Sequence, residues 1–187
     1  MREGQRRLNP ASSISDMRYG QMRQYDIANG SGIRSTIFVT GCRRACPECF
    51  NEEYQNFQAG SLWTEKETQQ MIQWLRDPNV EGLTLLGGEP MENAEGLAGV
   101  VRAVKAEISK SVWVYSGYLW EEILRDPLKK NLLELCDVLV DGPFINALRD
   151  PKLQFRGSSN QRVIDIAKSL KDGQIVLYRD EITGHVM

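Results

Sequence analysis

Histidine is nearly absent from this chain of 187 residues, and its charges almost cancel. The one histidine, His185, is close to the last residue, and we interpret it as incidental rather than catalytic. With 23 basic and 25 acidic residues the net charge is -2, which creates no overall field to attract nucleic acid or an anionic membrane. We therefore expect partners to be recognised at local sites, and we expect no binding of nucleic acid.

Long apolar runs are missing as well. No uncharged apolar stretch approaches the roughly 20 residues that a membrane-spanning helix needs. Residues 1–10 are charged and polar where a signal peptide would be apolar. We therefore expect a cytoplasmic protein that does not contact the membrane. Residues 1–18 are polar and lack periodicity, so we predict a flexible polar leader there and a single domain over 19–187.

Cysteine is scarce, but three of the four cysteines are clustered. Cys42, Cys46 and Cys49 form a C-x3-C-x2-C pattern, which in a reducing compartment indicates metal binding rather than disulfides. Three thiolates from one short loop can hold three corners of a cubane iron-sulfur cluster, which normally takes four cysteine ligands, so one iron would stay open to a substrate. Cys136 lies in a mostly apolar run, and we interpret it as a buried core residue.

Strand and helix patterns alternate along the rest of the chain. Strands are predicted over 35–40, 80–86, 112–115, 137–140, 162–166 and 174–178, and helices over 65–76, 94–109, 119–125 and 129–135. This alternation indicates parallel pairing with right-handed crossovers. A complete eight-fold barrel needs about 250 residues. We therefore predict an α/β fold with a mostly parallel sheet, in the form of a partial, open βα barrel.

A double-glycine segment, Gly87-Gly88-Glu89-Pro90, follows the predicted strand 80–86 directly, just as the cysteine loop follows the strand 35–40. Taken alone, such a segment is more often an ordinary turn. Glycines allow a ligand to approach the backbone closely and leave carbonyls free for an ammonium group. Because ligands bind beyond the carboxyl ends of parallel strands, both segments are expected on one rim of the sheet, where they would form one site.

Two polar residues end the next strands on the same predicted rim. Ser116 and Asp141 are placed there to meet a ligand, although an aspartate before Gly-Pro is also a common turn former. Neither residue is needed as an acid or base for chemistry that a metal cluster carries.

The cysteine motif, continued by Phe50 and Asn51, resembles the radical S-adenosylmethionine superfamily when it is taken together with Gly87-Gly88-Glu89-Pro90. The resemblance implies that the cysteines hold a 4Fe-4S cluster and that S-adenosyl-L-methionine chelates the open iron. It also implies that Phe50 lies near the adenine and that the double-glycine turn binds the amino group. The candidate metal ligands are Cys42, Cys46 and Cys49, and the candidate cofactor-binding residues are Glu48, Cys49, Phe50, Gly87, Gly88, Glu89, Pro90, Ser116 and Asp141.

Four further segments, 25–34, 113–118, 140–144 and 156–162, resemble the activating enzymes of anaerobic ribonucleoside-triphosphate reductases. The most distinctive of them reads Arg156-Gly157-Ser158-Ser159-Asn160-Gln161-Arg162. This resemblance implies that a one-electron donor such as a flavodoxin or ferredoxin reduces the cluster, that S-adenosylmethionine is cleaved, and that a glycyl radical forms on the reductase. Many members carry histidine and glycine where this chain has Arg44 and Glu48.

Alternative functions stay open at this point. The chain could activate another glycyl-radical enzyme or act on a small molecule by the same chemistry. A more remote alternative is a non-catalytic zinc module with Cys136 or His185 as a fourth ligand, although structural zinc usually takes its ligands from two nearby pairs. Arg156, Asn160 and Arg162 could serve a docking surface or bind a carboxylate, or they could belong to a solvated loop.

Overall fold

The computed structural model describes residues 16–180 and 184–187. Residues 1–15 of the predicted leader lie outside the described residues. Met17 is fully buried, and the first strand begins at Arg18. Among the described helices, none has both the length and the apolar character that a bilayer crossing requires.

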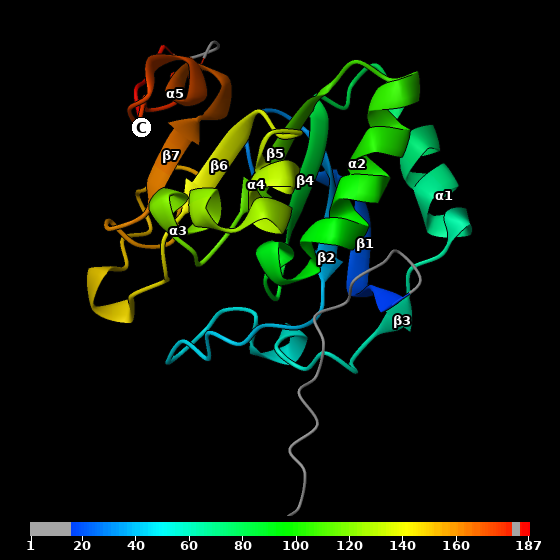
Figure 1. Ribbon diagram of the computed structural model, residues 1–187, viewed down its shortest axis with the longest axis horizontal. Coiled ribbons are helices and arrows are strands. Elements are labelled where there is room, and N and C mark those ends of the chain that lie inside the picture. The colour runs from blue at the N-terminus through cyan, green and yellow to red at the C-terminus, as the bar shows by residue number, and fades with distance from the viewer. Residues whose placement is uncertain (1–15, 181–183) are drawn as a thin grey trace, which may run out of the picture.

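Seven strands form one open sheet in the order β3-β1-β2-β4-β5-β6-β7 (Figure 1). The strands are β1 (Arg18–Asp26), β2 (Arg34–Val39), β3 (Ser61–Leu62), β4 (Gly82–Gly87), β5 (Ser111–Tyr115), β6 (Val138–Asp141) and β7 (Arg162–Asp165). The α-helices are α1 (Glu65–Leu75), α2 (Ala94–Glu107), α3 (Trp120–Arg125), α4 (Pro127–Leu133) and α5 (Ile166–Asp172). The short 3-10 helices η2 (Glu52–Tyr54), η3 (Pro90–Asn93) and η4 (Asn146–Leu148) lie in the loops of the described chain. The α/β class predicted from the sequence is thus confirmed.

Parallel pairing joins the four central strands β2, β4, β5 and β6, as the alternation of strand and helix predicts. Both edges are antiparallel, since β1 pairs with β2 and β3, and β7 pairs with β6. A parallel neighbour needs a crossover of a dozen or more residues, and residues 27–33 between β1 and β2 are too few for one. The predicted strand 174–178 forms only an isolated bridge, between Leu177 and Ile164.

The helices cover one face of the sheet. Figure 1 shows α1, α2 and α4 on this face, and Ile37 and Leu85 belong to the apolar core beneath them. Side chains alternate along a strand, so Phe38 and Leu86 point to the opposite face, where they line a cavity together with Tyr115. The sheet therefore has one face packed against helices and one face that forms the wall of a cavity.

Helix ends agree with the capping signals in the sequence. The hydroxyl of Thr64 accepts a hydrogen bond from the backbone of Lys66, and the carboxylate of Glu67 accepts one from the backbone of Thr64, which forms a capping box at the start of α1. The helix predicted over 129–135 begins earlier, at Pro127, because Asp126 caps it and proline is well suited to a first helical turn.

Candidate metal centre

The cysteine loop starts where β2 ends and is fixed at its base by backbone hydrogen bonds. The N–H of Gly41 donates to the carbonyl of Tyr54 at 2.8 Å, and the N–H of Cys42 donates to the carbonyl of Gln55 at 2.9 Å. The N–H of Glu89 donates to the carbonyl of Gly41 at 2.9 Å. The start of the cysteine loop and the double-glycine segment are therefore bonded directly to each other.

Both glycines of the segment are required by this close approach. A Cβ on Gly87 would lie 2.4 Å from the carbonyl oxygen of Val39, and the φ of Gly87 is +114°. A Cβ on Gly88 would lie 2.5 Å from the carbonyl oxygen of Tyr54 and 2.7 Å from that of Gly41. Any side chain at Gly88 would push the cysteine loop away from the end of β4. The glycines thus serve the packing of two backbones, in addition to the ligand approach expected from the sequence.

Two residues between the cysteines have left-handed backbone conformations. The φ of Ala45 is 44° and that of Glu48 is 55°. Such values cost a non-glycine residue roughly 1–2 kcal/mol, and they let the chain turn sharply between one cysteine and the next. After the third cysteine, the N–H of Asn51 donates to the sulfur of Cys49 at 3.4 Å. The side-chain amide of Asn146 donates to the carboxylate of Glu48.

One cavity of about 650 Å³ brings most of the predicted site together. Its lining includes Cys42, Cys46, Cys49, Phe50, Gly87, Gly88, Glu89, Pro90 and Ser116. The volume lies within the range of about 300–1,000 Å³ that is usual for small-molecule sites. The three cysteines and the double-glycine segment therefore face a shared space at the carboxyl ends of the parallel strands.

Glu48 and Asp141 are not part of this lining. The carboxylate of Asp141 is fully buried and accepts hydrogen bonds from the backbone of Trp120 at 2.8 Å and from Nε of Arg162 at 2.9 Å. Asp141 thus fixes the start of α3 and the start of β7. The structure directs its side chain away from the cavity, which the position at the strand end alone does not reveal.

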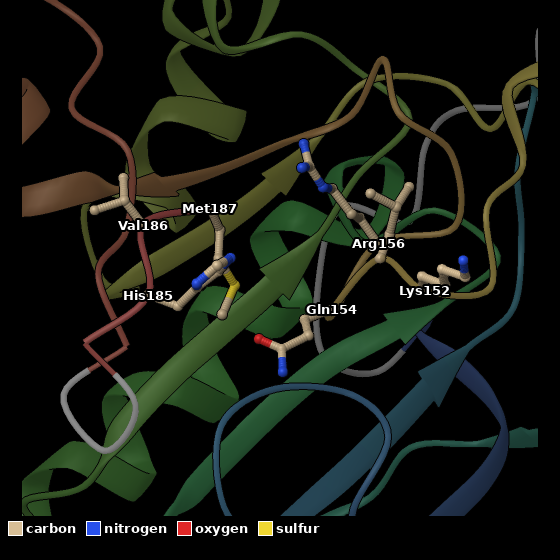
Figure 2. A pocket seen from close by; sticks show the side chains of 7 residues that line it. Lys152, Gln154, Arg156, His185, Val186 and Met187 are labelled. Atoms are coloured by element: carbon tan, nitrogen blue, oxygen red, sulfur yellow. The ribbon is translucent and has the colours of Figure 1, made fainter.

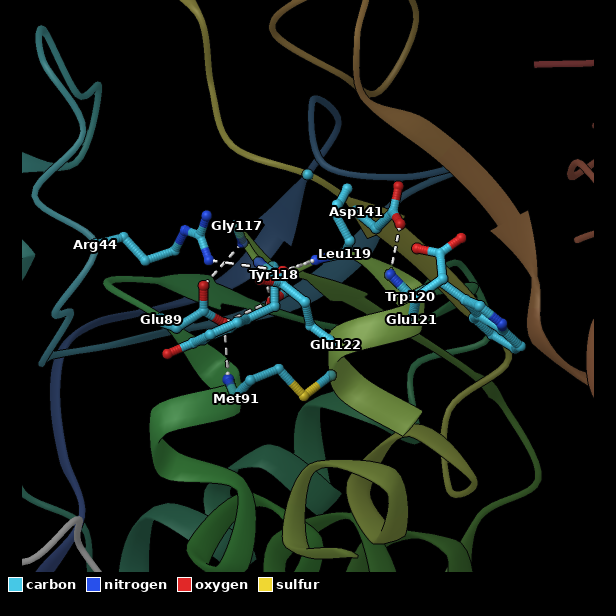
Figure 3. Close-up of polar contacts among 12 residues, drawn as sticks. Arg44, Glu89, Met91, Gly117, Tyr118, Leu119, Trp120, Glu121, Glu122 and Asp141 are labelled. Carbon is cyan, nitrogen blue, oxygen red and sulfur yellow. Dashed lines mark hydrogen bonds and ion pairs between the residues drawn. The ribbon is translucent and has the colours of Figure 1, made fainter. Parts of the chain in front are cut away.

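Glu89 is the buried carboxylate of the site, with an exposed fraction of 2% (Figure 3). Its Oε1 accepts hydrogen bonds from the backbone of Met91 at 2.9 Å and from the hydroxyl of Ser116 at 2.8 Å, and its Oε2 accepts one from the backbone of Gly117 at 2.8 Å. Burial raises the pKa of Glu89 to about 7, while these hydrogen bonds and the charge of Arg44 limit the increase. Ser116 therefore orients Glu89 at the cavity wall.

Sequence reasoning missed Arg44, Tyr115 and Gly117 as cavity residues. Nε of Arg44 and the hydroxyl of Tyr115 are buried and have no hydrogen-bond partner within the described chain. Buried polar groups are normally paired, so these atoms indicate that a polar ligand belongs in the cavity. The position of Arg44 between two cysteines was the available sequence signal, and for Tyr115 it was the alternation of faces along β5.

The donor set suits an iron-sulfur cluster. Cys42, Cys46 and Cys49 all line the cavity, and thiolates are the usual ligands of iron-sulfur clusters. In the part of the chain that the structure describes, no three His, Cys, Asp or Glu side chains converge on a point that suits a single metal ion. A cubane cluster offers a separate iron to each thiolate and does not require such convergence.

Neither proposed fourth ligand for zinc reaches the cysteines. Cys136 is buried in the core under the helices, where its thiol donates to the carbonyl of Leu132 at 3.3 Å. His185 lines a second cavity, of about 320 Å³, together with Lys152 and with Arg156, which also lines the cysteine cavity (Figure 2). Neither fourth ligand that the sequence offered for a zinc module therefore lies at this site within residues 16–180 and 184–187.

The distinctive segment 156–162 is held by hydrogen bonds within the segment and to the rim of the sheet. The amide oxygen of Gln161 accepts hydrogen bonds from the backbone of Gly157 at 2.9 Å and of Ser158 at 3.2 Å, and its amide nitrogen donates to the carbonyl of Gly142 at 3.0 Å. Arg156 and Gln161 also line the cysteine cavity. The segment thus forms an ordered wall of the cavity.

Comparison with known proteins agrees with these features. The model of the 4Fe-4S single cluster domain matches residues 28–164, so the chain belongs to a class of iron-sulfur proteins. The chain is 42% identical over 150 residues to the anaerobic ribonucleoside-triphosphate reductase-activating protein of Haemophilus influenzae, covering 78% of this chain and 96% of that protein. The proteins of the same name from Escherichia coli K12 and enterobacteria phage T4 are 38% and 35% identical, over 97% and 93% of their lengths and 79% of this chain. The chain belongs to the family of anaerobic ribonucleoside-triphosphate reductase-activating proteins, which confirms the resemblance found in the sequence.

Proposed function

We propose that this protein uses a 4Fe-4S cluster and S-adenosyl-L-methionine to generate a glycyl radical on the anaerobic ribonucleoside-triphosphate reductase. Cys42, Cys46 and Cys49 hold the cluster, and the adjoining cavity holds S-adenosylmethionine. The observation that carries the proposal is the shared cavity, which is lined by the three cysteines and by the double-glycine segment from a different loop. The names of the relatives, which span almost their whole length, support the reductase as the target.

The residues of this chain position the groups and keep them from water. The three thiols supply one ligand each, and the N–H of Asn51 stabilises the charge on the sulfur of Cys49. Gly87 and Gly88 expose backbone to the cavity, where carbonyls accept hydrogen bonds from an ammonium group. When bound, the cluster and S-adenosylmethionine supply the radical chemistry that removes a hydrogen atom from a glycine of the reductase.

Phe50 is an aromatic residue of the cavity lining that is largely exposed. It is 60% exposed, its ring lies 4.7 Å from that of Phe144, and the guanidinium of Arg149 lies 5.0 Å from its centre. An exposed aromatic ring beside a cavity provides a stacking surface for a base. We assign Phe50 to the adenine of S-adenosylmethionine.

The remaining assignments follow from the same family membership. The open sheet is a partial βα barrel of the radical S-adenosylmethionine type. Its single domain, predicted over 19–187, also includes Met17, which is buried, and Arg18, the first residue of β1. A one-electron donor such as a flavodoxin or ferredoxin reduces the cluster, and the protein works in the cytoplasm. It requires no contact with nucleic acid or with a membrane.

Activation of another glycyl-radical enzyme and a small-molecule reaction are the competing functions. The test is anaerobic incubation of the reconstituted protein with reductant, S-adenosylmethionine and the reductase, followed by electron paramagnetic resonance. A glycyl radical signal is expected. Formation of 5'-deoxyadenosine without that signal would exclude the reductase as target. Protein that contains zinc and shows no iron-sulfur signal would exclude the radical chemistry altogether.

Single cysteine variants test the ligand assignment in the same assay. Cys42→Ala, Cys46→Ala and Cys49→Ala should each abolish cleavage of S-adenosylmethionine. Cys136→Ala is the matched control and should keep it, because that thiol is buried in the core. Loss of iron in the control would mean that a fourth protein ligand exists.

A further inference from the structure

Arg44 has an unusual environment at the wall of the cysteine cavity. It lies between the first two cysteines, and its side chain is only 23% exposed. Its guanidinium lies 4.8 Å from the centre of the Tyr118 ring. Gly117 makes room for it, since a Cβ there would lie 2.6 Å from Cδ of Arg44. The side chain is therefore held across the end of β5 rather than extended into solvent (Figure 3).

The hydrogen-bonding capacity of Arg44 is incompletely used. Its Nε is buried and has no partner within the described residues. The distance from Nη1 of Arg44 to Oε2 of Glu122 is 3.9 Å, which is too long for a hydrogen bond. Because buried donors of a guanidinium are almost always paired, this arrangement is complete only with an acceptor in the cavity. An anionic group suits a guanidinium best.

The buried carboxylate of Glu89 also lies close to Gly117. A Cβ on Gly117 would lie 2.9 Å from Nε of Arg44 and 3.4 Å from Oε2 of Glu89. Glu89 accepts three hydrogen bonds, and a carboxylate offers about four acceptor positions, so one remains for a ligand. In an α-amino acid, the ammonium and carboxylate groups sit on one carbon. A carboxylate and a guanidinium side by side are therefore complementary to such a zwitterion.

We propose that Arg44 is a positioning residue that binds the carboxylate of the amino-acid part of S-adenosylmethionine, with Glu89 facing its ammonium group. This inference rests on the proposed function, which supplies the identity of the ligand. Arg43, the next residue along the loop, provides the contrast. Its guanidinium pairs with Glu92 and lies 5.0 Å from the centre of the Phe57 ring, and it does not line the cavity.

Binding measurements test the assignment without any turnover. The protein is reconstituted anaerobically, and dissociation constants for S-adenosylmethionine and for its decarboxylated form are measured by equilibrium dialysis in the absence of reductant. Arg44→Met should weaken the binding of S-adenosylmethionine by about tenfold to a hundredfold, the usual loss for a charge-assisted hydrogen bond. It should leave the affinity for the decarboxylated form unchanged. Arg43→Met removes the same charge from the same loop and should change neither constant.

Two results would overturn the assignment: equal affinity of Arg44→Met and the unaltered protein for S-adenosylmethionine, or an equal loss of affinity for both ligands. Iron content and the visible absorption spectrum establish that each variant holds its cluster. If Arg44→Met loses the cluster, Arg44→Lys is measured in its place. A loss of affinity for S-adenosylmethionine alone then supports the assignment. An equal loss of affinity for S-adenosylmethionine and its decarboxylated form refutes it. An unaltered protein that binds neither ligand would contradict the proposed function itself.

Discussion

The buried carboxyl group of Glu89 is expected to make the protein less stable as the pH rises. The ordinary pKa of 4.5 is raised by burial to about 7 in the folded protein. Between these two values, the folded protein holds a proton that the unfolded chain has already released. The free energy of unfolding therefore falls as the pH rises through this window. At about 1.36 kcal/mol for each pH unit, the loss amounts to roughly 3 kcal/mol.

Glu89→Gln removes the titrating carboxyl group but keeps most of its hydrogen bonds, so the variant distinguishes the effect of titration from that of hydrogen bonding. The glutamine oxygen can still accept from Met91 and Ser116, but the amide nitrogen meets the N–H of Gly117, which is also a donor. This mismatch costs roughly 1–3 kcal/mol at every pH. The pH-dependent part of the difference between the two proteins therefore belongs to the carboxyl group alone.

Urea unfolding of the reduced, metal-free protein from about pH 5 to about pH 8 measures both effects. The unaltered protein should lose roughly 2.5 kcal/mol more than Glu89→Gln over this range, because part of the titration lies below pH 5. Ser116→Ala removes a hydrogen bond that lowers the pKa of Glu89, so it should extend the pH-dependent loss of stability to higher pH. Parallel pH profiles for the unaltered protein and Glu89→Gln would refute the reasoning, because the buried carboxyl would then titrate as it does in the unfolded chain.

Three further comparisons of variants test the loop and the core. Gly88→Ala should lower the free energy of unfolding by about 1–3 kcal/mol and reduce iron uptake, because its Cβ would lie 2.5 Å from the carbonyl oxygen of Tyr54. Gly173→Ala is the control: Gly173 has a φ of +68° and open space around it, so this change should cost about 1 kcal/mol and leave the iron content unchanged. Glu48→Gly should be more stable than Glu48→Ala by about 1 kcal/mol in thermal unfolding, because φ is 55° there, and equal stability would show that the conformation is not strained. Cys136→Ala should cost roughly 1 kcal/mol with its iron content intact, and loss of iron would contradict its assignment to the core.

The central part of the fold was predictable because its signals are local. β2, β4 and β5 form from apolar runs of sequence that are bounded by turns. The capping box at Thr64 marks the start of α1. The edges were less accessible. β1 is a polar strand with a mixed burial pattern, RYGQMRQYD, so neither alternation nor an apolar run identifies it. The antiparallel return of β7 depends on a long connection without a crossover helix, which no local pattern specifies.

In the candidate site, too, some residues could be predicted from the sequence and others could not. Motif spacing and strand ends indicated the cysteines and Gly87 to Pro90, and these residues do line one cavity. Asp141 follows the same rule of position, yet its side chain is held by Arg162 and by the backbone of Trp120. A strand end fixes where a backbone lies, whereas the direction of a side chain depends on partners from distant parts of the chain.

The hydrogen bonds between the two loops imply that cluster loading and ligand binding are coupled. The N–H of Glu89 donates to the carbonyl of Gly41, next to the first cysteine, while the carboxylate of Glu89 faces the cavity. A cluster that orders the cysteine loop therefore also fixes the backbone that carries Glu89. Arg44 lies in the same loop, so both halves of the proposed zwitterion site are held by elements that the cluster orders. Because coupling between two sites is reciprocal, S-adenosylmethionine should in turn slow the loss of iron to a chelator. That protection should be weaker in Arg44→Met than in Arg43→Met, and equal protection in both would show that the coupling does not pass through Arg44.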